Sequence, residues 1–189
     1  MQPLAYQVLQ TSCWVTSMLN GIMLLNNGKH VPFMAYKLLH NLLVKEGVFY
    51  YNKEDIKAFE AIVASVGLCS NLKISWESCN TVEPCLMSLD YQHQLAVCDV
   101  GAGDHSILIS GYENGIFQAF DPYWDSVKDC KSVKEEYEIF SPYMPKSGNS
   151  VNILIWKEHL FATKRNQDYK GYKMGAESMR RATILTQYR

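Results

Sequence analysis

Cys13 begins an apolar stretch with helical spacing, a position that would suit a cysteine nucleophile. The N–H groups of a first helical turn point out of the end of the helix, and with the helix dipole they favour a thiolate. Gln7 lies six residues upstream, and its amide could help those N–H groups to hold an oxyanion. Cys13 alone has an ordinary alternative, because a free cysteine in a helix is most often a small buried residue.

A cysteine nucleophile needs a base and a group that orients the base, and one predicted hairpin offers both. His105 begins an apolar run, Asp121 ends a second run, and Asn114-Gly115 between them is a strong signal for a tight β-turn. Such a turn places residue 121 opposite residue 107, so the Asp121 carboxylate can reach the His105 imidazole. Singly, each residue has a plain structural explanation, at a strand end or in a turn. Together with the cysteine and the glutamine they indicate a catalytic site.

This combination resembles the papain-like cysteine peptidases, and most closely their C39-like branch. That branch includes the bacteriocin-processing leader peptidases and many free-standing bacterial homologues. The matching motifs lie within residues 2–156: the Gln7-to-Cys13 spacing, Cys13-Trp14 at a helix start, Asp104-His105, Gly111-Tyr112 and Phe120-Asp121-Pro122.

The resemblance implies that Cys13 is the nucleophile, His105 the base and then the acid, and Asp121 the orienting residue. It also implies that Gln7 forms the oxyanion hole with the Cys13 backbone N–H. The residues just before the cysteine depart from those of other branches, and Gln10 is a competing amide. The expected reaction is cysteine-dependent acyl transfer, with hydrolysis of a peptide or protein substrate and no cofactor. An acyltransferase or transpeptidase with the same triad and a non-catalytic binding module on a protease-like fold are the alternatives.

The elements that would position these residues follow from hydrophobic spacing and turn signals. Helical spacing predicts helices over about 12–27, 32–47, 52–67 and 81–89, and a short helix is expected around 132–137. Apolar and alternating runs predict strands at 71–76, 94–99, 105–112, 115–120 and 151–156. Helices followed by antiparallel strands predict an α+β fold. The resemblance implies a papain-like fold, in which an N-terminal helical subdomain packs its nucleophile helix on an antiparallel sheet.

Length and charge predict one domain with an extension. The chain has 189 residues and a net charge of −1, which argues against nucleic-acid binding by bulk charge. Basic residues are concentrated after residue 156. We therefore predict a catalytic domain over residues 1–156 and a basic C-terminal extension over 157–189. That extension is expected to be solvated or partly ordered, and it could bind an anionic partner or the acidic body.

The cysteines and the N-terminus predict a compartment. The chain has six cysteines, no signal peptide and no apolar run long enough to span a membrane. We expect a reducing, cytoplasmic setting with free thiols, and a secreted or translocated effector is the alternative. Cys79 and Cys85 are too far apart for a CxxC pair, which argues against a structural metal site.

Overall fold

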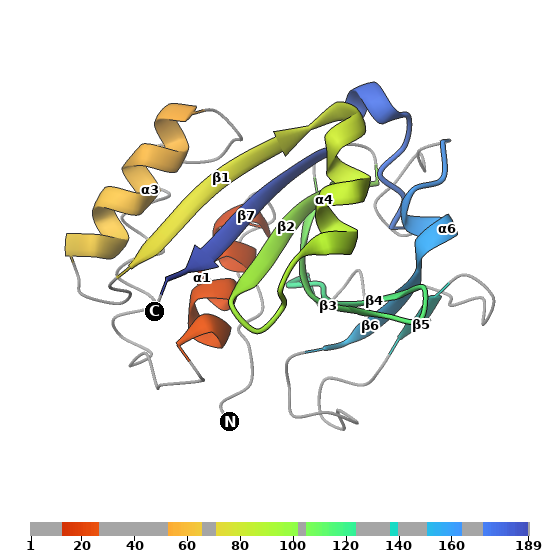
Figure 1. The fold of residues 1–189 in the computed structure, drawn as a ribbon, viewed down its shortest axis with the longest axis horizontal. Coiled ribbons are helices and arrows are strands. Elements are labelled where there is room, and N and C mark those ends of the chain that lie inside the picture. Colours follow the sequence, from red (N-terminus) through yellow and green to blue (C-terminus); the bar gives the residue numbers. More distant parts are fainter. Residues whose placement is uncertain are drawn as a thin grey trace.

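The computed structural model describes residues 13–26, 53–65, 71–101, 105–123, 137–139, 151–163 and 172–188 (Figure 1). Its helices are α1 (Cys13–Leu25), α3 (Lys53–Ser65), α4 (Val82–Ser88) and α6 (Lys157–Leu160), with 3₁₀ turns η1 (Cys79–Thr81) and η3 (Glu177–Met179). Its strands are β1 (Leu72–Ser78), β2 (Gln94–Val100), β3 (His105–Glu113), β4 (Ile116–Phe120), β5 (Tyr137–Ile139), β6 (Ile153–Trp156) and β7 (Arg181–Gln187).

The strands form one seven-stranded sheet in the order β1-β7-β2-β3-β4-β6-β5, and every neighbouring pair is antiparallel. Two helices precede the first strand in the chain, so the α+β class with an antiparallel sheet is confirmed. The helix expected over 32–47 lies outside the described residues. The predicted helical subdomain is therefore described only by α1 and α3.

Helix α1 covers one face of the sheet, behind β2 and β7 in Figure 1. Its spacing predicts one apolar face of five residues, and Val15, Met18, Leu19 and Ile22 are buried, whereas Met23 is partly buried against the same cluster. A Cβ added at Gly21 would collide with the Leu185 side chain of β7, so the helix backbone lies close against the sheet. Hydrogen bonds tie the helix to the sheet: Trp14 Nε1–H donates to Thr183 Oγ1 at 3.3 Å, and Ser17 Oγ–H donates to the Ser106 carbonyl at 3.2 Å.

Helix α3 packs beside α1 through the apolar stripe that its spacing predicts. Ile56, Phe59 and Val63 are buried in the same cluster as Trp14. The rings of Phe59 and Trp14 meet edge to face, with their centroids 5.7 Å apart. The residue after the nucleophile position is thereby held between a helix on one side and the sheet on the other.

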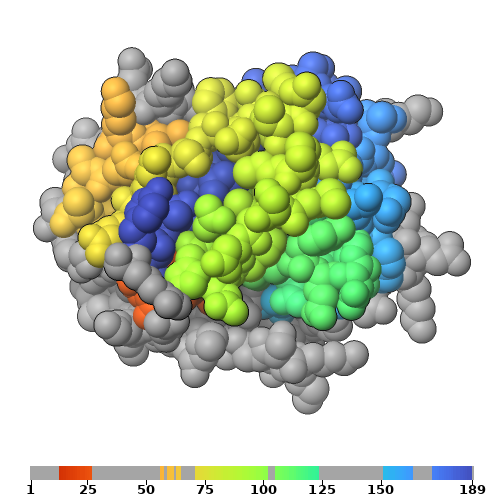
Figure 2. Space-filling model, viewed as in Figure 1, coloured from red at the N-terminus to blue at the C-terminus, as the bar shows by residue number. Residues whose placement is uncertain are grey.

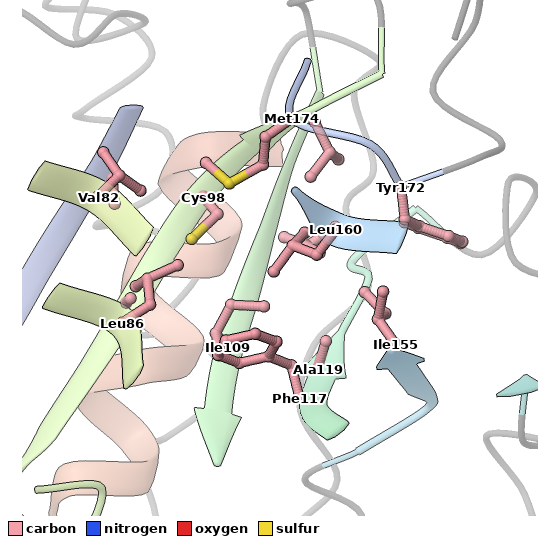
Figure 3. Close-up of a cluster of buried hydrophobic side chains, with 14 of the residues drawn as sticks. Val82, Leu86, Cys98, Ile109, Phe117, Ala119, Ile155, Leu160, Tyr172 and Met174 are labelled. Carbon is pink, nitrogen blue, oxygen red and sulfur yellow. The ribbon is translucent and has the colours of Figure 1, made fainter. Parts of the chain in front are cut away.

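The opposite face of the sheet carries a second apolar cluster, covered by α4, α6 and residues 172–174 (Figure 3). Val82 and Leu86 of α4 lie over Cys98 and Ile109 in this view, with α1 behind the sheet. The short helix expected over 81–89 with Thr81 as its cap is confirmed as α4, with Thr81 at the N-cap position. The Thr81 hydroxyl donates to the Ser78 carbonyl at 2.8 Å and makes no capping bond to the helix.

The C-terminal strand β7 lies between β1 and β2, in the interior of the sheet (Figure 1). The expectation of a solvated or partly ordered end is therefore wrong for residues 172–188. Residues 182–185 are all buried because both faces of the sheet are covered, so this strand lacks the polar–apolar alternation of a strand with one solvated face. Arg180 is also buried, and it forms an ion pair of 3.0 Å with Glu83 of α4.

The short helix expected around residues 132–137 is tested only at its last residue. Tyr137 belongs to strand β5, which pairs with β6, and residues 131–136 lie outside the described part of the chain. The thiols of Cys79, Cys85 and Cys98 are free and Cys13 is in no disulfide bond with a described residue, whereas Cys69 and Cys130 are not among the described residues. None of the described helices is long and apolar enough to cross a membrane.

Candidate active site

The predicted hairpin is confirmed, and its register brings His105 and Asp121 to the same end of two paired strands. Leu108 of β3 pairs with Phe120 of β4, so residue 121 lies opposite residue 107, as the position of the Asn114-Gly115 turn predicts. At the other end the turn uses left-handed backbone at Asn114 and Gly115, with φ of 52° and 81°. A β-bulge between Ile109 and Gly111 shifts the register only toward that turn.

His105 and Asp121 form a buried pair. The His105 Nε2 atom lies 2.8 Å from Asp121 Oδ1, and the two side chains are 3% and 0% exposed. A carboxylate at this distance fixes which imidazole nitrogen carries the proton and stabilises the imidazolium. Because Nε2 faces Asp121, the remaining nitrogen, Nδ1, is available for the nucleophile.

Cys13 completes the group of three. It is the first residue of α1, it is only 6% exposed, and its side chain hydrogen-bonds to that of His105. The same helix is held one turn later by the bond from Ser17 to the Ser106 carbonyl, next to His105 in β3. The structure therefore brings together Cys13, His105 and Asp121, which are far apart in the chain.

The charge of His105 is set by two opposing influences. Burial lowers the pKa of the imidazole, because a charged group loses its hydration. The charge and hydrogen bond of Asp121, together with those of Cys13, outweigh burial and raise the pKa to about 10. The site therefore favours an imidazolium at neutral pH. A thiolate on Cys13 and an imidazolium on His105 would stabilise each other in such a site.

Three residues that the sequence analysis did not assign to the site hold Asp121 in place. The Tyr123 backbone N–H donates to Asp121 Oδ1 at 2.7 Å, and the Tyr172 hydroxyl donates to Oδ2 at 2.9 Å. The Asn152 side chain accepts from the Asp121 N–H at 2.8 Å and donates to the Asp121 carbonyl at 2.9 Å. Asn152 is a lone polar residue in an apolar run, a signal that could have marked it. Tyr172 carries no comparable signal.

Several residues near the site lie at or beyond the edge of the described chain. Gln7 and Gln10, the two candidate oxyanion donors, are outside the described residues, as is Trp124. The half-buried ring of Tyr123 lies beside His105, with centroids 6.4 Å apart, in a position to shield the imidazole. Gly101 adopts a φ of 69° before the loop that leads to His105.

The arrangement contains the parts that covalent acyl transfer needs. They are a thiol at a helix start, an imidazole that can take its proton, and a buried carboxylate that orients the imidazole. No protein-family model, curated protein or solved structure matches this chain.

Proposed function

We propose that this protein is a cysteine peptidase that catalyses acyl transfer through Cys13, His105 and Asp121. The observation that carries the proposal is the position of His105, which hydrogen-bonds to Cys13 and lies 2.8 Å from Asp121 in a buried site. A cysteine that only fills space in the core would not require a hydrogen bond to a buried histidine. A non-catalytic binding module would have no need of a buried charged pair beside that thiol.

The proposed mechanism starts from the ion pair, in which the Cys13 proton already lies on His105 Nδ1 and Cys13 is a thiolate. The Cys13 sulfur then attacks the substrate carbonyl carbon, a C–S bond forms, and the carbonyl electrons move to oxygen as an oxyanion. When the oxyanion collapses, the C–N bond breaks and His105 gives its proton to the leaving amine. Water, deprotonated by His105, attacks the thioester and releases the acid, and the Cys13 thiolate and the His105 imidazolium are restored. Asp121 stabilises the imidazolium in both halves of the reaction.

The oxyanion would be held by the Cys13 backbone N–H at the start of α1 and by a side-chain amide. We assign that amide to Gln7, with Gln10 as the competing donor. Backbone and amide donors in such a site are effective because they are aimed at the charge before the charge develops.

The order of elements supports a papain-like fold of the C39-like kind. A helix that begins with the nucleophile packs on an antiparallel sheet, and one hairpin of that sheet supplies the base and the orienting carboxylate. By the same proposal the substrate is a peptide or protein. The free thiols of Cys79, Cys85 and Cys98 support a reducing, cytoplasmic setting.

The test is cleavage of a peptide library in water enriched in oxygen-18. A peptidase releases new carboxyl termini that carry the label, whereas an acyltransferase or transpeptidase releases unlabelled products joined to an amine. Cys13→Ala and His105→Ala should each abolish the labelled products. Cys79→Ser is the matched control, because Cys79 is an exposed free thiol on η1, and it should retain activity. Equal turnover by wild type and Cys13→Ala would contradict the proposal.

A further inference from the structure

Residues 172–174 form a short strap that contacts the candidate site from the C-terminal part of the chain. The Tyr172 hydroxyl donates to Asp121 Oδ2 at 2.9 Å. The Lys173 carbonyl accepts from the Gly101 N–H at 2.9 Å, at the start of the loop that leads to His105. The Met174 N–H donates to the Leu160 carbonyl at 2.8 Å. The strap therefore holds the Asp121 carboxylate and also the backbone at Gly101, four residues before His105.

Tyr172 is buried and held in an unusual conformation. Its side chain is 0% exposed, and it joins the apolar cluster with Met174, Leu160 and Ile155 (Figure 3). Its φ is 52°, in the left-handed region that bulky side chains rarely adopt. Such backbone persists only where the surrounding contacts hold it, and it is found at functional sites more often than elsewhere.

The Asp121 carboxylate needs both of its oxygens fixed in order to keep its orientation. Oδ1 accepts from the Tyr123 N–H and faces His105 Nε2. Oδ2 accepts from Tyr172, and no other described residue donates to it. Without that hydroxyl, a buried carboxylate oxygen would lose its hydrogen bond, and rotation of the carboxylate toward another donor would be favoured.

We infer that Tyr172 is a positioning residue of the candidate active site: its buried hydroxyl orients the Asp121 carboxylate toward His105, so the C-terminal strap is part of the acyl-transfer machinery. This inference rests on the proposed function for its catalytic meaning. The orientation of Asp121 can be measured without any substrate, so the two claims can fail separately.

The experiment compares Tyr172→Phe with Tyr91→Phe by NMR titration of the His105 imidazole. Tyr91 is the matched control, because its hydroxyl also makes a hydrogen bond inside the protein, to the Leu86 carbonyl at 2.8 Å, away from the three site residues. Tyr172→Phe should lower the midpoint of the His105 titration by about one pH unit, a tenfold change in the protonation equilibrium. Alkylation of Cys13 by iodoacetamide should slow by a similar factor. Tyr91→Phe should change neither quantity.

A His105 midpoint in Tyr172→Phe equal to that in Tyr91→Phe would overturn the inference, whether or not the protein hydrolyses peptides. A lowered midpoint in a protein that hydrolyses nothing would support the positioning role and count against the proposed function. If Tyr172→Phe does not fold, a second measurement leaves Tyr172 in place and changes Asp121 instead. The ¹³Cζ resonance of Tyr172 should move on Asp121→Asn while that of Tyr91 stays, and an unmoved Tyr172 resonance would contradict the inference.

Discussion

At the scale of single residues, the charge of His105 depends on Asp121. Burial alone would make the imidazole neutral, because the protein interior solvates a charge poorly. The buried carboxylate at 2.8 Å reverses that preference. The orienting residue therefore decides whether the site contains a charged pair, in addition to fixing the direction of the ring.

Asp121→Asn should lower the pKa of His105 from about 10 toward neutral pH or below, since burial would remain and the largest influence that raises the pKa would be gone, leaving only that of Cys13. Much less of His105 would then be protonated at neutral pH, and peptide turnover should fall roughly 100-fold or more. NMR titration of labelled histidine measures the first effect and a kcat determination the second. A His105 in Asp121→Asn that still holds its proton at pH 9 would contradict this account of the site.

The choice between Gln7 and Gln10 gives a second prediction at this scale. Gln7→Ala should reduce kcat by roughly 100- to 1,000-fold with little change in KM, as loss of an oxyanion donor does. Gln10→Ala is the matched control and should leave kcat within a few-fold of wild type. The reverse pattern in the two kcat values would assign the oxyanion hole to Gln10.

The sequence was sufficient to predict the three central residues but not their supports. Cys13, His105 and Asp121 each stand at the end of a recognisable element, so local patterns placed them. Tyr172 reaches Asp121 across 51 positions of the chain. No local pattern encodes such a contact, because it depends on how the strap folds back over the sheet.

At the scale of elements, the close approach of α1 to the sheet places Cys13. The collision that a Cβ at Gly21 would cause with Leu185 shows how little space separates helix and strand. The hydrogen bond from the Ser17 hydroxyl to the Ser106 carbonyl then fixes the position of the helix along β3. Cys13 lies next to His105 because α1 is held against the sheet both at Gly21 and at Ser17.

Gly21→Val should therefore destabilise the protein by roughly 1–3 kcal/mol, because the added methyl groups would meet the end of the Leu185 side chain, so Leu185 must rotate or α1 must shift. A shift of α1 would carry Cys13 away from His105, so acyl transfer should then fall more steeply than stability. Ala64→Val is the control, because Ala64 is exposed on α3. Chemical denaturation measures both variants, and equal stability losses would show that α1 does not pack as closely as described.

Helices, the hairpin and the α+β class could be predicted because their signals are local. Apolar residues at helical spacing placed α1 and α3, and Asn114-Gly115 placed the β3–β4 turn. Strand β7 could not be recognised in the same way. Its central residues are buried on both faces, and the two arginines that precede them suggested a solvated tail.

At the scale of the whole molecule, the strand β7 joins β1 to the rest of the sheet. β7 pairs with β1 on one side and β2 on the other, so it connects the edge beside α3 to the strands that carry the site. In the space-filling view, β7 lies between the segments of β1 and β2 (Figure 2). Arg180, just before it, donates to the carbonyls of Gly175 and Phe161 as well as to Glu83.

Deletion of residues 172–189 should abolish cooperative folding. It would leave the facing edges of β1 and β2 without partners and open the cluster that Tyr172 and Met174 complete. Circular dichroism during thermal unfolding measures the outcome. The substitution Arg181→Ala, at an exposed position at the start of β7, is the control and should unfold almost as wild type does. A deletion variant with a normal transition would restore the view of this segment as an appendage.

The most direct test of the central claim is the reactivity of Cys13 relative to that of Cys79. Cys13 is buried and Cys79 is exposed, so accessibility alone predicts that iodoacetamide labels Cys79 first. The proposed pair with His105 predicts the opposite at about pH 7, below the ordinary thiol pKa of about 8.5. Peptide mapping after brief labelling should find the adduct on Cys13, and His105→Ala should remove that preference. Faster labelling of Cys79 than of Cys13 in the wild-type protein would contradict the account.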